Sequence, residues 1–227
     1  MSQSIKLWPV SEHPRERLLQ NGVEALSDAE LVAILLRNGL KGKDVLALSR
    51  ELLSQYGGVR GLLALDHHEL KKIKGLGEAK TATLLAATEI ARRSLREKVI
   101  GADFIRDPES VITYLANTLR DKKKEIFKVL FLSPANRIID EADLFHGTVD
   151  EAVIHVREVV KSALEHHASS VVLVHNHPSG RIEPSFEDRE MTRKLSAALN
   201  TISIKVLDHI IIGDNQYFSF SERNLLG

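Results

Sequence analysis

The sequence predicts two unlike parts, an all-helical region followed by a mixed α+β or α/β domain. Three observations predict this division. Apolar residues recur at three- and four-residue spacing from about residue 14 to 96. Strand-like apolar runs begin near residue 125. Residues 1–100 hold 16 basic and 12 acidic side chains, whereas residues 101–227 hold 15 and 19. We therefore expect one domain over residues 1–100 and a second over residues 105–227.

The first domain should contain four or five helices, because glycines interrupt the apolar periodicity at intervals. The periodic segments cover residues 16–39, 43–58, 69–73 and 81–98. Ser27 is followed three residues later by Glu30, which is the spacing of a capping box at a helix start. These features predict short helices that pack on one another.

In the second domain, helices and strands are expected to alternate. A short helix is predicted over residues 108–120, and the β-rich run after Glu125 predicts a hairpin over residues 125–148. The remaining predicted elements, in order, are a helix over 151–167, a buried strand over 169–177, a helix over 186–199 and a hairpin over 203–222. The order ββαβαββ is typical of a sheet with its functional site at strand ends.

The composition excludes several kinds of protein. The chain has no cysteine, so disulfides, cysteine-ligated zinc, iron–sulfur clusters and thiol nucleophiles are excluded. A net charge of zero argues against a nucleic-acid packaging protein. No apolar run approaches a membrane span, and the first residues lack the apolar stretch of a secretory signal. We expect a cytoplasmic protein without a membrane partner.

Two histidines at the end of the predicted buried strand indicate a metal site. Residues i and i+2 of a strand face the same side, so His175 and His177 present their imidazoles together. Asp188 lies in the first turn of the next predicted helix and can bring a carboxylate to the strand end. Two imidazoles and one carboxylate leave one zinc position open, as catalytic sites do.

Simpler interpretations remain open for the same residues. A histidine at a strand end is often a hydrogen-bonded residue of the core. Ser185 and Asp188 also have the spacing of a capping box, which a helix would use without a metal. A His₂Asp set suits zinc best but also accepts iron, manganese or cobalt.

The spacing of these residues resembles a known family. His175, His177, Ser185 and Asp188 fit the pattern H-x-H-x(7)-S-x(2)-D of the JAMM (MPN/JAB) metalloprotease-like domain. More closely, residues 14–227 resemble the bacterial RadC family, through IKGLGEAKTATLLAA, LFHGT, LVHNHPSG, PSFEDREMT, VLDHIIIG and SFSERNLLG. One departure is that His155-Val156-Arg157-Glu158 stands where a His-Pro-Arg-Glu stretch is expected. The resemblance implies an N-terminal helix-hairpin-helix domain and a mixed, cytidine-deaminase-like sheet flanked by helices.

The resemblance also implies a reaction and roles for particular residues. It implies a metallopeptidase with one zinc ion on His175, His177 and Asp188, which hydrolyses amide or isopeptide bonds of a peptide or protein substrate. Glu125 occupies the position of the catalytic glutamate, which takes a proton from water and passes it to the leaving amine. Ser185 would donate to the oxyanion of the tetrahedral intermediate. From the residues alone, Glu125 is equally the last member of the solvated charged run 121–125.

Residues 70–82 resemble a helix-hairpin-helix turn. In such a turn, backbone N–H groups at a helix N-terminus contact a DNA phosphate, with lysines nearby. The alternative is a tight turn used only for helix packing. The candidate contacts, which would give weak and sequence-independent DNA binding, are Lys74, Gly75, Gly77 and Lys80. The rival hypothesis for the whole chain follows from this motif: a DNA-associated repair or recombination accessory protein whose zinc site is structural or inactive.

Residues near the candidate site are assigned supporting roles. Asn176 should face the opposite side of the strand from its two histidine neighbours and is interpreted as structural. His209 lies on a neighbouring apolar strand, where packing or hydrogen bonding is favoured over support of a zinc ligand. Other zinc hydrolase classes do not fit, because HExxH, HxHxDH and the cysteines of zinc deaminases are all missing.

Overall fold

A computed structural model describes residues 9–146 and 156–226 of the chain. The chain divides into two compact units, residues 1–91 and 92–227. The first is helical and the second is built on a mixed five-stranded sheet, so the predicted α+β fold class is confirmed. The division falls inside one long helix, α6 (Glu78–Val99).

The helical unit contains more helices than expected. Between residues 9 and 99 the structure has six α-helices, where four or five were expected. The two shortest, α4 and α5, have five and six residues, which is too short to show a helical period in sequence. The elements are 3-10 helix η2 (Val10–Glu12), α1 (Pro14–Asn21), 3-10 helix η3 (Val23–Ala25), α2 (Asp28–Leu36), α3 (Val45–Tyr56), α4 (Val59–Leu63), α5 (His67–Lys72) and α6.

Local sequence explains where these helices begin and end. The capping box predicted at Ser27 and Glu30 is present at the start of α2. Asp44 and Asp66 cap α3 and α5 in the same way, through their carboxylates. Gly57 ends α3 with a φ of 72°, a left-handed conformation that glycine adopts without strain. Leucines from α2 to α6 form the core of this unit.

The second unit contains the predicted elements in the predicted order. They are α7 (Pro108–Leu119), β1 (Ile126–Leu132), β2 (Ile138–His146), α8 (Val156–Glu165), β3 (Ser170–Asn176), α9 (Phe186–Thr201), β4 (Lys205–Ile212) and β5 (Tyr217–Ser219). The helix expected over residues 151–167 is observed from Val156, because residues 151–155 lie outside the described part. His155 and the side chain of His146 lie outside it too, whereas Val156, which stands in place of the expected proline, is the first residue of α8.

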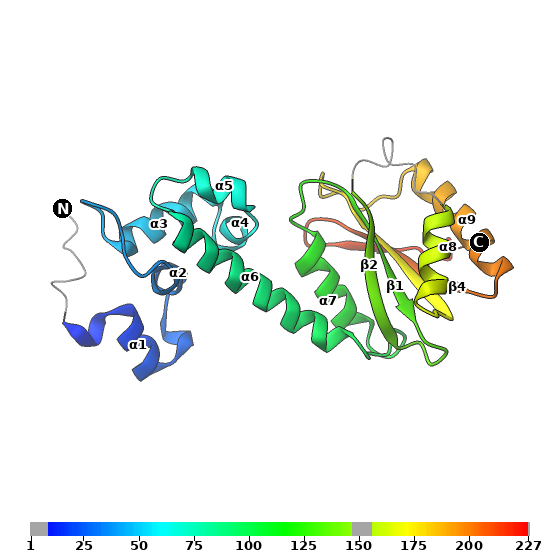
Figure 1. The fold of residues 1–227 in the computed structure, drawn as a ribbon, viewed down its shortest axis with the longest axis horizontal. Helices are drawn as coiled ribbons and strands as arrows, with labels where there is room; N and C mark the ends of the chain where they lie inside the picture. The colour runs from blue at the N-terminus through cyan, green and yellow to red at the C-terminus, as the bar shows by residue number, and fades with distance from the viewer. Residues whose placement is uncertain (1–8, 147–155, 227) are drawn as a thin grey trace. The chain divides into compact units, whose positions relative to one another are not determined.

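The sheet has the strand order β2-β1-β3-β4-β5, which puts β3 in the centre. Strand β3 pairs antiparallel with β1 and parallel with β4, and α9 makes the connection between the two parallel strands. Helix α7 packs on one face of the sheet, and α8 and α9 cover the other, as Figure 1 shows. All seven residues of β3 are buried.

The two faces of β3 carry different residues. Val172 and Val174 belong to the core cluster on the α7 side, and Val171 and Leu173 belong to the cluster on the α8 and α9 side. This alternation puts His175 on the α9 side and Asn176 on the α7 side. Both side chains are completely buried at the end of the strand. Among the described residues, no helix is long and apolar enough to cross a membrane.

Candidate metal centre

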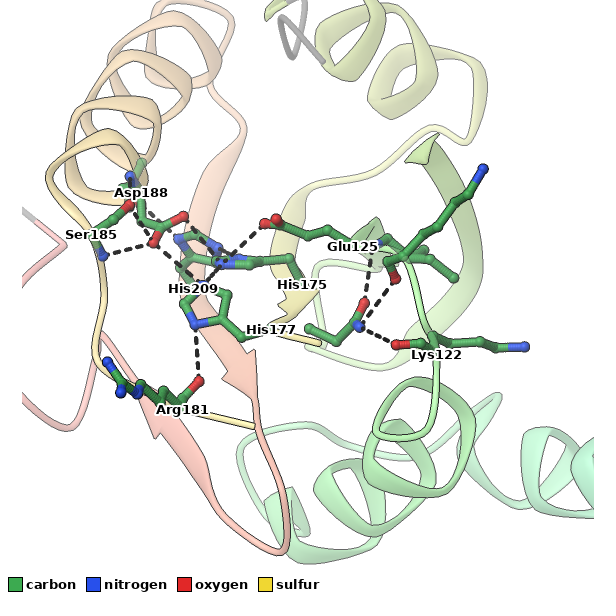
Figure 2. A network of polar contacts seen from close by, with 12 residues as sticks. Lys122, Glu125, His175, His177, Arg181, Ser185, Asp188 and His209 are labelled. Atoms are coloured by element: carbon green, nitrogen blue, oxygen red, sulfur yellow. Dashed lines mark hydrogen bonds and ion pairs between the residues drawn. The ribbon is translucent and has the colours of Figure 1, made fainter. Parts of the chain in front are cut away.

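The predicted pair of histidines converges at the end of β3. The Nε2 atoms of His175 and His177 lie 3.0 Å apart. His175 is the penultimate residue of the strand and is fully buried, whereas His177 follows the strand and leaves 16% of its side chain exposed. The strand period therefore brings both rings to one point, as Figure 2 shows.

Asp188 serves the helix and the site at once. One carboxylate oxygen, Oδ2, accepts hydrogen bonds from the amide N–H of Ser185 at 2.8 Å and from its Oγ at 2.7 Å. The capping box that sequence offered as an alternative is therefore present. The other oxygen, Oδ1, lies 3.1 Å from Nε2 of His175. The two interpretations do not compete, because Oδ1 takes no part in the cap, and Oδ2, which makes the cap, also lies 3.5 Å from Nε2 of His177.

Glu125 lies on the opposite side of the histidines from Asp188, just before β1 begins. Its Oε1 is 3.8 Å from Nε2 of His175, and only 13% of its side chain is exposed. Although Glu125 ends a run of exposed lysines, its carboxylate turns inward toward the site, as Figure 2 shows. One ligand atom from each of Glu125, His175, His177 and Asp188 lies within 4.8 Å of every other.

A chain of hydrogen bonds behind His175 connects the two ends of the site. The Nδ1 atom of His175 lies 2.8 Å from Nε2 of His209, a buried residue of β4. The Nδ1 atom of His209 lies 2.6 Å from the hydroxyl of Thr192, and this hydroxyl donates to the main-chain carbonyl of Asp188 at 2.6 Å. The chain therefore starts at one candidate ligand and ends on the backbone of another.

The directions of these hydrogen bonds follow from the carbonyl at the end. A carbonyl only accepts, so the Thr192 proton points to Asp188 and its oxygen accepts from Nδ1–H of His209. Burial holds the pKa of His209 well below its ordinary value, and the neutral ring has its lone pair on Nε2. His175 then donates from Nδ1, which leaves the lone pair of its Nε2 directed into the site.

His177 also has its proton on Nδ1 and its lone pair on Nε2. Its Nδ1 lies 2.9 Å from the carbonyl oxygen of Arg181, so this nitrogen carries the proton and Nε2 carries the lone pair. Two nitrogen lone pairs and Oδ1 of Asp188, a buried oxygen that accepts no hydrogen bond from the described residues, then face a common point. A cation satisfies all three, so the donor set fits a zinc-like metal.

The charges of the site perturb its titration. Burial by itself would raise the pKa of Asp188, but its contacts with His175 and His177 hold that pKa well below the ordinary value. Burial opposes protonation of His177, yet the hydrogen bond and charge of Asp188 outweigh it and raise the pKa of this imidazole. A proton and a metal ion therefore compete for the same acceptors.

A close backbone contact holds the loop that follows His177. The Asp214 amide N–H donates to the Gly180 carbonyl at 3.0 Å, and the His177 amide N–H donates to the Ile212 carbonyl at 3.0 Å. A Cβ on Gly213 would lie 2.5 Å from the Gly180 oxygen, so a side chain at this position would push the loop away. The end of β4 thereby fixes the carbonyl of Arg181 that orients His177.

The candidate DNA-contacting residues lie in the helical unit: Lys74, Gly75 and Gly77 between α5 and α6, and Lys80 in the first turn of α6. Lys74 is exposed, and Gly77 has open space around it. Gly75 adopts a φ of 101°, and a Cβ there would meet the Leu40 side chain at 2.8 Å. Lys80 turns inward and donates to the carbonyl oxygens of Gly75 at 3.1 Å and Gly39 at 3.4 Å. Burial lowers the pKa of the Lys80 ammonium. Half of this set therefore supports the turn itself.

The sequence did not lead to Thr192 as a residue of the site. For His209, it favoured a role in packing or hydrogen bonding over support of a metal-binding histidine. A signal for Thr192 was available, because residues four apart on a helix share a face and Thr192 follows Asp188 by four. No comparable signal exists for His209. Its contact with His175 depends on the parallel register of β3 and β4, which places His209 opposite Leu173.

A mixed sheet with two histidines at the end of its central strand, and an aspartate at the start of the next helix, defines a protein of the JAB class, which has a metalloprotease-like fold. Residues 105–225 match the family described as "RadC-like JAB domain", and residues 5–82 match "UPF0758 N-terminal". The chain belongs to this RadC, or UPF0758, family.

Full-length relatives carry the same name. A UPF0758 protein of Thioalkalivibrio sulfidiphilus is 48% identical over 219 residues, which cover 96% of this chain and 98% of the relative. A UPF0758 protein of Halorhodospira halophila is 46% identical over 223 residues, covering 98% of this chain and 100% of the relative. The similarity to both relatives extends over nearly the whole chain, so it includes the helical unit as well as the sheet.

Proposed function

We propose that this protein is a zinc-dependent hydrolase that cleaves amide or isopeptide bonds of a peptide or protein substrate. One observation carries the proposal. Two imidazole lone pairs and a buried carboxylate oxygen face one point at the strand end, and the Glu125 carboxylate lies 3.8 Å from the nearer imidazole. His175, His177 and Asp188 would hold the ion, and a fourth zinc position would remain open.

The roles of the chain's own residues follow from their positions. Zinc at this site would supply Lewis acidity and make a water molecule acidic near neutral pH. Glu125 would accept the proton of that water and deliver it to the departing nitrogen, because its carboxylate faces the histidines from the side opposite Asp188. Substrate would approach from the side of His177, whose side chain is 16% exposed to solvent.

Ser185 would have two successive tasks under this proposal. Its hydroxyl donates to Oδ2 of Asp188 at 2.7 Å, which orients the carboxylate for the metal. Stabilising an oxyanion requires the hydroxyl to turn from Asp188 toward substrate. A Ser185→Ala variant should therefore lose hydrolytic activity, because the oxyanion of the transition state is less stabilised. Its metal affinity should also fall, by a smaller factor than its activity.

The test combines metal analysis with hydrolysis. Wild-type protein purified at neutral pH should contain about one zinc per chain and cleave members of a panel of fluorogenic peptides and isopeptides. Glu125→Gln should keep the zinc and lose about 10²- to 10⁴-fold in rate, the usual worth of a general base. Equal rates for the two proteins would reject the role of Glu125, and a wild type that binds no zinc would reject the whole proposal.

We propose weak DNA binding by residues 70–82 as a second function. The observation that favours it is the N-terminus of α6, where the space above Gly77 is open and the neighbouring Lys71, Lys72 and Lys74 are exposed. A phosphate could approach the first N–H groups of the helix from there. Gly77→Glu should abolish salt-sensitive binding of duplex DNA without unfolding the unit, and unchanged binding would remove this function.

A further inference from the structure

The side chain of Asn176 joins the metal-binding strand to the segment that carries Glu125. Asn176 lies between the two histidines in sequence, but it faces the α7 side of the sheet. It is completely buried. Its amide group makes three hydrogen bonds, and all three go to main-chain atoms of residues 122–126.

These bonds hold the backbone on both sides of Glu125. The amide N–H of Ile126, directly after Glu125, donates to Oδ1 of Asn176 at 2.8 Å. The Nδ2 group of Asn176 donates to the carbonyl of Lys124, directly before Glu125, at 3.2 Å, and to the carbonyl of Lys122 at 3.4 Å. One side chain thus fixes both peptide neighbours of Glu125.

The sheet alone does not supply this anchor. The main-chain pairing of β1 with β3 begins at Phe127 and His175 and does not include Glu125. Residues 122–124 are exposed lysines, whose like charges favour a solvated loop. The Asn176 amide therefore extends the connection between the two strands by several residues, at the place where the backbone ladder stops.

We propose that Asn176 is the positioning residue for Glu125. It sets the place of the carboxylate relative to His175 by clamping the backbone from the far side of the sheet, and it touches neither metal nor substrate. This inference rests on the proposed function, since Glu125 has its catalytic task only there. One strand end would then serve the site from both faces: His175 and His177 bind the metal on one face, and Asn176 positions Glu125 from the other.

The chemistry of the clamp restricts which residue can form it. The position needs one acceptor for Ile126 and two donors for the carbonyls of Lys122 and Lys124, and a primary amide provides both. An aspartate keeps the acceptor for the amide of Ile126. In place of the Nδ2 donor, however, it puts a carboxylate oxygen next to the carbonyl oxygens of Lys122 and Lys124, which it repels. An alanine leaves all three main-chain groups without this partner, including the buried amide of Ile126.

The experiment compares Asn176→Ala and Asn176→Asp with wild type and with Val111→Ala, which empties part of the core under α7. Zinc affinity is measured by chelator competition, and kcat and KM are measured on a cleaved fluorogenic peptide. A readout independent of activity is the visible spectrum of Co²⁺-substituted protein as a function of pH, with Glu125→Gln as reference. Hydrogen exchange at the Ile126 amide reports on the clamp itself.

The proposal expects both Asn176 variants to keep the zinc affinity of wild type and to lose on the order of 10²-fold in kcat with little change in KM, as a misplaced catalytic group does. The pH midpoint of the spectral change in their Co²⁺-substituted forms should shift from the wild-type value toward the value for Glu125→Gln. Adding Asn176→Ala to Glu125→Gln should cause no further loss. Val111→Ala should leave the midpoint and kcat at the wild-type level.

Two contrary results are distinguishable. If the wild type cleaves peptides but the Asn176 variants lose no more activity than Val111→Ala, and their Co²⁺ midpoint stays at the wild-type value, the positioning role is wrong and the proposed function stands. If the wild type cleaves nothing while the Co²⁺ midpoint of the Asn176 variants follows that of Glu125→Gln, the proposed hydrolase activity fails and the clamp on Glu125 stands.

Discussion

The end of β3 and the turn between α5 and α6 both carry polar residues at fixed spacing, but the two regions use them in opposite ways. At the strand end, the hydrogen bonds behind His175 and His177 leave both Nε2 lone pairs directed at a shared point. In the turn, Lys80 is directed inward and donates to carbonyl oxygens of the turn and of Gly39.

This difference shows how a functional site can be separated from a structural one that looks similar in sequence. A structural motif satisfies its own polar groups, as Lys80 does with the carbonyl of Gly75. In the ligand site, by contrast, acceptors face one another: Oδ1 of Asp188, which accepts no hydrogen bond from the described residues, lies 3.1 Å from Nε2 of His175.

The largest effect is expected for His175→Ala, because it removes a ligand atom and also the donor to His209. The purified variant should contain nearly no zinc, against about one equivalent in wild type, as measured by elemental analysis. Lys80→Met, which removes a polar group of the turn, serves as the control and should keep its zinc. A zinc content in His175→Ala equal to wild type would place the metal elsewhere.

Thr192→Val should weaken zinc binding without removing any ligand. The valine has nearly the shape of threonine but cannot accept from Nδ1 of His209, so the tautomer of His209, and with it that of His175, is no longer fixed. Loss of such an outer partner typically costs about 10- to 100-fold in metal affinity.

Thr192→Ser keeps the hydroxyl and should bind zinc nearly as wild type does. Chelator competition measures both affinities, and nitrogen NMR of the histidine rings should find the Nδ1–H form of His209. The opposite ring form in wild-type protein, or equal affinities for the valine and serine variants, would contradict the hydrogen-bond directions derived above.

The two glycines of the turn should differ in stability effects. Gly75→Ala forces a φ of 101° on a residue with a side chain and brings Cβ to 2.8 Å from Leu40, so it should cost about 1–3 kcal/mol of unfolding free energy. Gly77→Ala meets open space and should stay within about 0.5 kcal/mol of wild type.

Urea denaturation of the two glycine variants measures the difference. Equal stabilities would mean that the conformation of Gly75 does not stabilise the turn. The residues of the turn could then no longer be contrasted, as structural residues, with those at the strand end. The result also decides which glycine is suitable for DNA-binding tests, since only a variant that preserves the fold can report on phosphate contacts.

The smallest effect is a pH dependence of the metal-free protein. The pKa of His177 is raised above its ordinary value of 6.5, so its stabilising contribution is full below about pH 6.5 and is lost as pH rises through the folded-state pKa. The pKa of Asp188 is lowered from 3.8, so its contribution is present above about pH 4 and is lost as pH falls further.

Buried His209, whose pKa is held well below its ordinary value, contributes the opposite slope in this pH range. The contribution of His177 is therefore measured against a His177→Gln variant, and the urea midpoint of metal-free wild type should exceed that of the variant by more near pH 5.5 than near pH 8. His177→Gln should lose that part of the pH dependence. Zinc affinity should move the other way and rise with pH, because protons compete for the same imidazoles. A wild-type advantage over His177→Gln that grows between about pH 5.5 and 8 would mean that His177 and Asp188 are not coupled as the geometry indicates.

Sequence alone determined the elements and the short-range geometry of the site. Strand alternation places His175 and His177 on one side and Asn176 on the other, and a helix cap places Asp188 in the first turn of α9. Strand alternation and helix capping depend only on residues close in sequence, so both can be predicted without knowledge of the rest of the fold. The helices α4 and α5 escaped them because one or two turns show no period.

Only the tertiary structure decided which distant segments complete the site. The carboxylate of Glu125 faces His175 because β1 pairs antiparallel with β3, and His209 reaches His175 because β4 lies parallel on the other side. The three hydrogen bonds from Asn176 to the segment of Glu125 span about fifty positions of the chain. Pairing between strands depends on the packing of both sheet faces, and no spacing within a single segment encodes it.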